Sequence, residues 1–157
     1  MPTYPSSPLH FVQAPEIHEL PRQTPPVYNA YFVAKTKVDG ILAVGVAHAS
    51  SPTGPFTATD APLVFDKIGA IDPTFYSENG THYVVWKTDG NSQLKPCNIR
   101  IQQLTSDGLA LAPGSSFATL MTNDKPWEGA VVEAPWIVKR LGVYYLFYSG
   151  MGYADSQ

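Results

Sequence analysis

The stretch VVEAPWI, residues 131–137, is an apolar, β-prone run with a single carboxylate, Glu133, near its middle. The chain makes a similar shape twice earlier, as VQAPEI at residues 12–17 and as AIDPTFY at residues 70–76. Each copy contains a proline, and the second carries an aspartate beside it, whereas the first has a glutamine where the third has its glutamate. Three similar strands predict a repeat protein whose repeats meet at a shared acidic site.

The composition of the 157-residue chain is typical of an all-β globular protein. Apolar residues make up 44% and aromatic residues 12%, which is enough to build a real core. Fifteen prolines and twelve glycines interrupt runs rich in Val, Ile, Thr and aromatic residues, a pattern of short strands and tight turns. No segment sustains a 3.6-residue apolar period over three turns, so we expect no long helix.

Turn signals divide the chain into strands. Hairpin signals stand at Asp39-Gly40, Asn79-Gly80 and Leu141-Gly142, and Asn79-Gly80 is the strongest of them. The strands between the turns are expected at about 11–17, 27–33, 41–49, 70–76, 81–87, 98–104, 116–121, 130–139 and 143–149, with a short outer strand starting at 56–57.

A four-stranded unit that recurs at roughly 60 residues is typical of a β-propeller blade. We expect a flexible lead-in at 1–9 and a partial propeller domain over 10–157, with blades at about 10–66, 67–125 and 126–157. The chain would then hold about two and a half blades, and its last strand would have no third strand to pair with. Such an open edge favours strand addition, so two copies could associate to complete a ring.

Charge and cysteine content exclude several classes of protein. The net charge is -3 without a cluster of Lys or Arg, which argues against nucleic acid or an anionic membrane as a partner. The chain contains no run of 18 apolar residues, so the sequence predicts no membrane-spanning helix. The one cysteine, Cys97, excludes an internal disulfide and is interpreted as a small residue at a strand start. The chain has four histidines, which are His10, His18, His48 and His82. Their spacing is not that of metal ligands, so we expect neither a metal nor a cofactor.

The N-terminal sequence MPTYPSSPLHF lacks the basic region and apolar core of a signal peptide. Two interpretations stay open, an intracellular chain or a chain whose true N-terminus is missing, and the localisation is left unassigned.

Two carboxylates could carry chemistry. Asp72 and Glu133 lie on first strands, which a propeller places nearest its axis, among apolar neighbours. A carboxylate in an apolar pocket has its pKa raised and can act as a general acid, and two acids flank the scissile bond in glycoside hydrolysis. The alternative is an Asx-type turn at Asp72 before Pro73 and a surface ion pair at Glu133. Because the two acids stand at different distances from their prolines, a bulge or a shifted register is needed to turn both inward.

Four aromatic residues could stack on sugar rings: Trp86, Trp127, Trp136 and Tyr153. The alternative for each of them is a place in the core of a blade. Asn79-Gly80-Thr81 matches an N-glycosylation acceptor, but a tight hairpin requires the same residues.

The segments IDPTFYSENGTHYVVWK, VVEAPWIVKRLGVYYLFYSG and the pair VQAPEI with ASSPTGPF resemble glycoside hydrolase family 43. The resemblance implies a five-bladed β-propeller that acts on arabinose- and xylose-containing polysaccharides of the plant cell wall, in a family usually secreted. It runs from the second blade to the middle of the fourth. Related sucrose- and fructan-cleaving families have an Arg before the Asp-Pro pair and a Glu-Cys pair, whereas this chain has Ile71 and Ala134 there.

The resemblance also implies residue roles for hydrolysis with inversion. Glu133 corresponds to the general acid, and Asp72 to the carboxylate that tunes and orients it. Gln13 replaces a tryptophan common in the family, and Trp86 and Trp136 complete the expected substrate-binding residues. The family's general base is an aspartate of the first blade and has no counterpart here, so the chain alone should be impaired. The alternative is a glycan-binding or truncated propeller that assembles with another copy.

Overall fold

The computed structural model describes residues 12–93 and 95–152, so the lead-in predicted at 1–9 lies outside the described residues. The strands are β1 Val12–Glu19, β2 Tyr28–Lys35, β3 Leu42–Ala49, β4 Thr57–Ala58, β5 Ala70–Glu78, β6 Thr81–Thr88, β7 Asn98–Gln103, β8 Ala118–Thr122, β9 Val132–Arg140 and β10 Val143–Gly150. Two 3₁₀ helices, η1 Asn91–Gln93 and η2 Pro126–Glu128, are the helical elements of this part of the chain. Neither is long or apolar enough to cross a membrane.

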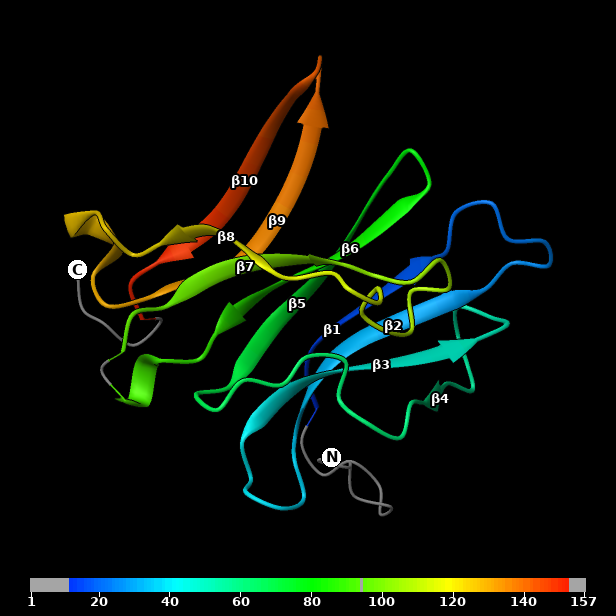
Figure 1. The fold of residues 1–157 in the computed structure, drawn as a ribbon, viewed down its shortest axis with the longest axis horizontal. Coiled ribbons are helices and arrows are strands. Elements are labelled where there is room, and N and C mark those ends of the chain that lie inside the picture. The colour runs from blue at the N-terminus through cyan, green and yellow to red at the C-terminus, as the bar shows by residue number, and fades with distance from the viewer. Residues whose placement is uncertain (1–11, 94, 153–157) are drawn as a thin grey trace.

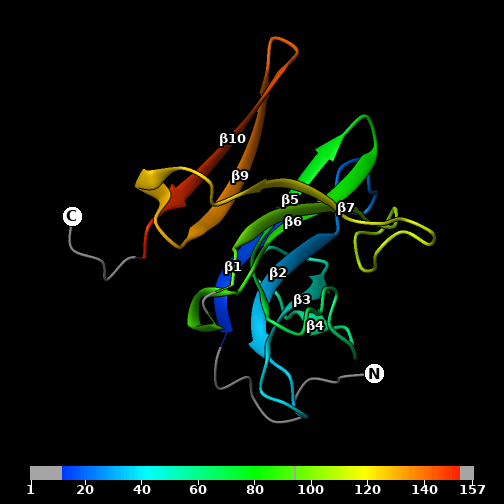
Figure 2. The ribbon, with the colours of Figure 1, turned by 60° about the vertical axis from the view of Figure 1, so that its left-hand side comes forward.

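The strands form three antiparallel sheets, each built from strands consecutive in the chain (Figure 1). Sheet A has the order β1-β2-β3-β4, sheet B has the order β5-β6-β7-β8, and β9 pairs with β10 in a hairpin. In Figure 2 the β9–β10 hairpin stands apart from the two larger sheets. Two four-stranded sheets and one two-stranded sheet confirm the prediction of an incomplete β-propeller of about two and a half blades.

The turns follow from local backbone preferences. Asn79 and Gly80 join β5 to β6 with φ angles of 52° and 84°, as a two-residue hairpin requires. Leu141 and Gly142 join β9 to β10 with φ angles of 50° and 81°. Both hairpin predictions are confirmed. The Asp39-Gly40 signal instead falls within a longer loop, in which the Asp39 carboxylate accepts a hydrogen bond from the Thr36 hydroxyl.

Apolar side chains fill the spaces between successive sheets. Along β6, alternate residues face opposite neighbours. Val84 and Trp86 pack with Tyr31 and Val44 of sheet A, and all four are at most 2% exposed. Val85 belongs to a second cluster that includes Val132 of β9. Sheet B is therefore covered on both faces.

The segment before β9 is anchored by a buried carboxylate. Glu128 Oε2 accepts hydrogen bonds from the backbone N–H groups of Asp124 (2.7 Å) and Lys125 (2.8 Å). Glu128 Oε1 accepts a hydrogen bond from the Tyr148 hydroxyl at 2.7 Å. These contacts fix the chain at the start of the hairpin.

The β9–β10 hairpin extends away from the larger sheets (Figure 1). Among the described residues, β10 pairs only with β9, as the sequence predicted. Several large apolar side chains of the hairpin are exposed: Trp136, Val138, Val143, Tyr144, Tyr145 and Phe147. An unpaired strand edge and exposed apolar side chains therefore lie together on this hairpin of the described chain.

Candidate functional site

The first strand of each sheet has the same irregularity at its proline; these strands are β1, β5 and β9. The register shifts between Gln13 and Glu16 in β1, and between Ile71 and Thr74 in β5. In β9, Ala134 and Pro135 lie opposite the single residue Tyr148. Each strand thus carries a β-bulge, which bends it and redirects its side chains.

The residue before each proline takes a left-handed backbone conformation. Ala14, Asp72 and Ala134 have φ angles of 46°, 51° and 52°. Asp72 therefore occupies the same place in β5 as Ala134 in β9, whereas Glu133 occupies the same place as Gln13. The bulge that the sequence required to bring both carboxylates inward is present in all three strands.

A hollow of about 600 Å³ opens over the bulges, and we call it the acidic hollow. It brings together three of the predicted site residues: Gln13, Asp72 and Glu133. Each of the other lining residues comes from a different strand, 3₁₀ helix or loop; they are Ala14, Leu42, Ile71, Asp89, Asn91, Ala134 and Ser149. Polar side chains from separate sheets therefore face one space.

Asp72 links β5 to β9, the first strands of two neighbouring sheets. Its Oδ2 accepts a hydrogen bond from the backbone N–H of Ala134 at 3.0 Å, across 62 positions of sequence. Because Ala134 follows Glu133 directly, the carboxylate of Asp72 helps to fix the backbone that carries Glu133. This contact between strands replaces the local Asx-type turn considered from sequence.

Glu133 does not lie in an apolar pocket, so that expectation is wrong. Its Oε2 accepts a hydrogen bond from Lys87 Nζ at 3.2 Å, and its side chain is 24% exposed. The side chain of Lys87 is fully buried, and its Nζ also lies 4.0 Å from Asp89 Oδ1. An ion pair at Glu133, which was the alternative considered from sequence, is present, but its lysine is buried and not on the surface.

The tryptophans divide between the core and the surface. Trp86 is 2% exposed, so it is a blade-core residue with no ring face for a sugar. Trp136 is 47% exposed and borders a second hollow of about 340 Å³ on the proline side of the bulges. Trp127 is exposed but stacks on Tyr148, with 5.5 Å between the ring centroids. Tyr153, the fourth aromatic candidate, lies outside the described residues.

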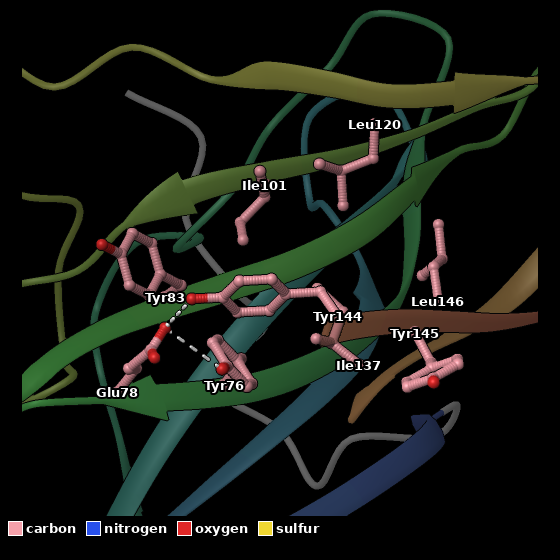
Figure 3. Close-up of a pocket in the computed structure, with 9 residues that line it drawn as sticks. All are labelled: Tyr76, Glu78, Tyr83, Ile101, Leu120, Ile137, Tyr144, Tyr145 and Leu146. Atoms are coloured by element: carbon pink, nitrogen blue, oxygen red, sulfur yellow. Dashed lines mark hydrogen bonds between the residues drawn. The ribbon is translucent and has the colours of Figure 1, made fainter. Parts of the chain in front are cut away.

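A third hollow, of about 370 Å³, lies between sheet B and the β9–β10 hairpin (Figure 3). The hydroxyls of Tyr144 and Tyr76 point toward Glu78 and donate to its Oε2 at 2.6 Å and 3.4 Å. Glu78 also pairs with Lys139. Hydrogen bonds from Lys139 and Tyr144 lower the pKa of Glu78, and they engage its carboxylate within the protein.

His18 and His82 each have a partner other than a metal ion, and His10 lies outside the described residues. His82 is 4% exposed, its Nδ1 lies 2.9 Å from the Ser77 hydroxyl, and burial lowers its pKa. His18 pairs with Glu16 at 2.9 Å. Within residues 12–93 and 95–152, no group of three or more His, Cys, Asp or Glu side chains is arranged to hold a metal ion.

The family model of Glycosyl hydrolases family 43 matches residues 2–157. The chain belongs to this family. No curated protein matches the sequence. Among solved structures, the chain is similar to a thermostable family-43 glycoside hydrolase, with 27% identity and a TM-score of 0.76 over 91% of this chain and 47% of the other.

Two further structures show the same fold. An endo-1,4-beta-xylanase from Bacteroides thetaiotaomicron is 23% identical, with a TM-score of 0.74 over 98% of this chain and 48% of the xylanase. An endo-arabinase from the same organism is 18% identical, with a TM-score of 0.74 over 90% of this chain and 52% of the arabinase. The chain thus spans about half the length of the family 43 structures that it matches.

Sequence reasoning missed three residues of this family 43 chain, namely Lys87, Asp89 and Asn91. Lys87 ends the run VVWK in phase with the buried Val85, and a lysine at a buried strand position indicates an anionic partner nearby. The position of Lys87 in the sequence therefore indicates an anionic partner, which the structure shows to be Glu133. Asp89 and Asn91 lie between the strands expected at 81–87 and 98–104, and their approach to β9 depends on how the sheets pack.

Proposed function

We propose that this chain carries the proton-donating half of an inverting glycosidase site. The substrates would be O-glycosidic bonds in arabinose- or xylose-containing oligosaccharides and polysaccharides of the plant cell wall. The observation that supports the proposal is the convergence of Asp72 and Glu133 at the acidic hollow, where the bulges aim both carboxylates at one space. The xylanase and the arabinase that share the fold support this substrate class.

The proposed reaction is a single displacement. Glu133, in its protonated form, gives its proton to the glycosidic oxygen as the bond from that oxygen to the anomeric carbon breaks. Water attacks the anomeric carbon from the opposite face, and the configuration inverts. Asp72 keeps the strand of Glu133 in place through the Ala134 N–H. General acid and general base catalysis each contribute about 10²–10⁴-fold in rate.

Two other side chains would hold the sugar. The half-exposed ring of Trp136 offers an apolar face, which suits the apolar face of a pyranose or furanose. Gln13 faces the acidic hollow with an amide that can both donate and accept hydrogen bonds, which suits sugar hydroxyls. Trp86 is left out of the proposed site because it is buried.

Inversion also requires a carboxylate that takes a proton from water. Asp72 is bonded to the Ala134 N–H, and Asp89 lies beside Lys87, so both remaining carboxylates of the acidic hollow are already engaged. We therefore expect the chain alone to bind saccharide but to turn it over slowly.

Hydrolysis of 4-nitrophenyl α-L-arabinofuranoside and 4-nitrophenyl β-D-xyloside by the purified chain tests this expectation. We expect turnover near background. In the same preparation, we expect calorimetry to show that xylotriose binds. Robust turnover that disappears in Glu133→Gln would show that a base is present after all. If that turnover also disappeared in Asp89→Asn, Asp89 would be the base. Failure of both xylotriose and arabinotriose to bind would contradict the proposal.

A second candidate function is glycan binding without cleavage, which the exposed Trp136 beside engaged carboxylates favours. It predicts that saccharide binding survives Glu133→Gln and is lost in Trp136→Ala. Trp127→Ala is the matched control, because Trp127 is similarly exposed but lies in η2 and packs on Tyr148.

A further inference from the structure

Lys87 is a charged side chain with no access to solvent. It lies on β6, two positions after Val85 and on the same face of the strand, so it points from sheet B toward β9. Its side chain is 0% exposed. A buried ammonium group is stable in a protein only beside an anionic or hydrogen-bonding partner.

Its partners both belong to the acidic hollow. Lys87 Nζ lies 3.2 Å from Glu133 Oε2 and 4.0 Å from Asp89 Oδ1. The Glu133 contact has hydrogen-bond geometry, whereas the Asp89 contact is at the limit of an ion pair. Glu133 is therefore the principal partner, and the rigid strand β6 determines where its carboxylate lies.

We infer that Lys87 is a positioning residue for Glu133, acting from beneath the acidic hollow. This inference rests on the proposed function, in which Glu133 donates a proton. Because Oε2 is held by Lys87, Oε1 is the oxygen left to carry the proton toward the glycosidic oxygen.

The ammonium group also acts during proton transfer. As Glu133 gives its proton to the leaving oxygen, negative charge returns to its carboxylate. A fixed cation that is already in place stabilises this charge without reorganisation, which is how preorganised groups assist catalysis. A lysine that only filled space at this position would have neither effect.

The test uses three variants of the whole chain: Lys87→Met, which keeps an unbranched apolar stem without the charge, Glu133→Gln, and the two combined. Lys139→Met and Glu78→Gln form the matched control pair, because the side chain of Lys139 is 37% exposed. The first readout is the ¹H–¹⁵N spectrum of the lysine ammonium groups. We expect a slowly exchanging Lys87 signal that moves in Glu133→Gln and stays unchanged in Glu78→Gln.

The second readout is the effect of xylotriose. We expect xylotriose to move the Lys87 signal of the wild-type chain, and Lys87→Met to weaken xylotriose binding about tenfold, with no further loss in the double variant. Thermal unfolding shows which variants are folded. Because the double variant removes both charges, we expect it to be more stable than Glu133→Gln alone.

Two results would overturn the inference. One is a Lys87 signal that does not respond to Glu133→Gln, and the other is a folded Lys87→Met variant that binds xylotriose like the wild-type chain. A wild-type chain that binds neither xylotriose nor arabinotriose, but whose Lys87 signal still responds to Glu133→Gln, would refute the proposed function and support the pairing of Lys87 with Glu133.

Discussion

Asp72 is expected to stabilise the contact between β5 and β9, and a series of substitutions can separate its contributions. Its Oδ2 accepts the Ala134 N–H at 3.0 Å, and its backbone has a φ of 51°. A hydrogen bond to a charged group contributes about 1.5–3 kcal/mol, and the low end applies at this partly exposed site. Aspartate also tolerates a left-handed backbone better than alanine.

Asp72→Ala removes both contributions, and we expect it to cost about 2 kcal/mol, combining the low-end hydrogen bond with a small backbone penalty. For a chain of this size that loss lowers Tm by about 4–8 °C. Asp72→Asn keeps an acceptor oxygen and the tolerance for positive φ, so we expect a smaller loss. Asp72→Gly keeps the backbone conformation but not the hydrogen bond, so it should lie between wild-type and alanine.

Urea unfolding followed by tryptophan fluorescence measures this series. The slope of the unfolding free energy against urea should be unchanged, because the variants lose a contact and not a folded segment. Equal stability of Asp72→Ala and the wild-type chain would refute the argument that Asp72 fixes the strand that carries Glu133. So would an Asp72→Asn variant that is as unstable as Asp72→Ala.

Other parts of the fold give three more predictions. A Cβ at Gly108, where φ is 68°, would lie 2.7 Å from both Asn29 Nδ2 and Tyr31 Oη, so Gly108→Ala should cost about 1–3 kcal/mol in thermal unfolding, and an unchanged Tm would contradict this. Burial lowers the pKa of His82, so the unfolded chain binds this proton more tightly and stability should fall as the pH drops below about 6.5. His82→Gln should flatten that decline, and an identical pH profile in the variant would refute the assignment. The free edge of β10 should give concentration-dependent dimers in sedimentation velocity, and a compact monomer at every concentration would rule out self-association.

Features set by local sequence were predicted well. Asn79-Gly80 and Leu141-Gly142 both form two-residue turns, because their positive φ angles suit the twist of a hairpin. Strand positions followed from apolar runs between such turns. Asp39-Gly40 shows the limit, since the same type of signal lies in a longer loop held by Thr36.

Features that depend on packing were predicted less well. The need for a bulge could be seen from the different offsets of Asp72 and Glu133 from their prolines, but its presence in β1 as well could not. Trp86 was placed among the sugar-binding candidates because sequence does not tell which face of β6 meets sheet A. The partner of Glu133 was missed for the same reason, since Lys87 reaches it only when sheet B and the hairpin pack together.

The proposed function rests on the donation of a proton by Glu133 to a departing sugar in the acidic hollow. The most direct test supplies the nucleophile from outside, by incubating the chain with xylobiose or arabinobiose and sodium azide, an anion that attacks without a base. We expect a glycosyl azide of inverted configuration from the wild-type chain, none from Glu133→Gln, and an undiminished yield from the exposed control Asp124→Asn. Absence of glycosyl azide with the wild-type chain, or an equal yield with Glu133→Gln, would contradict it.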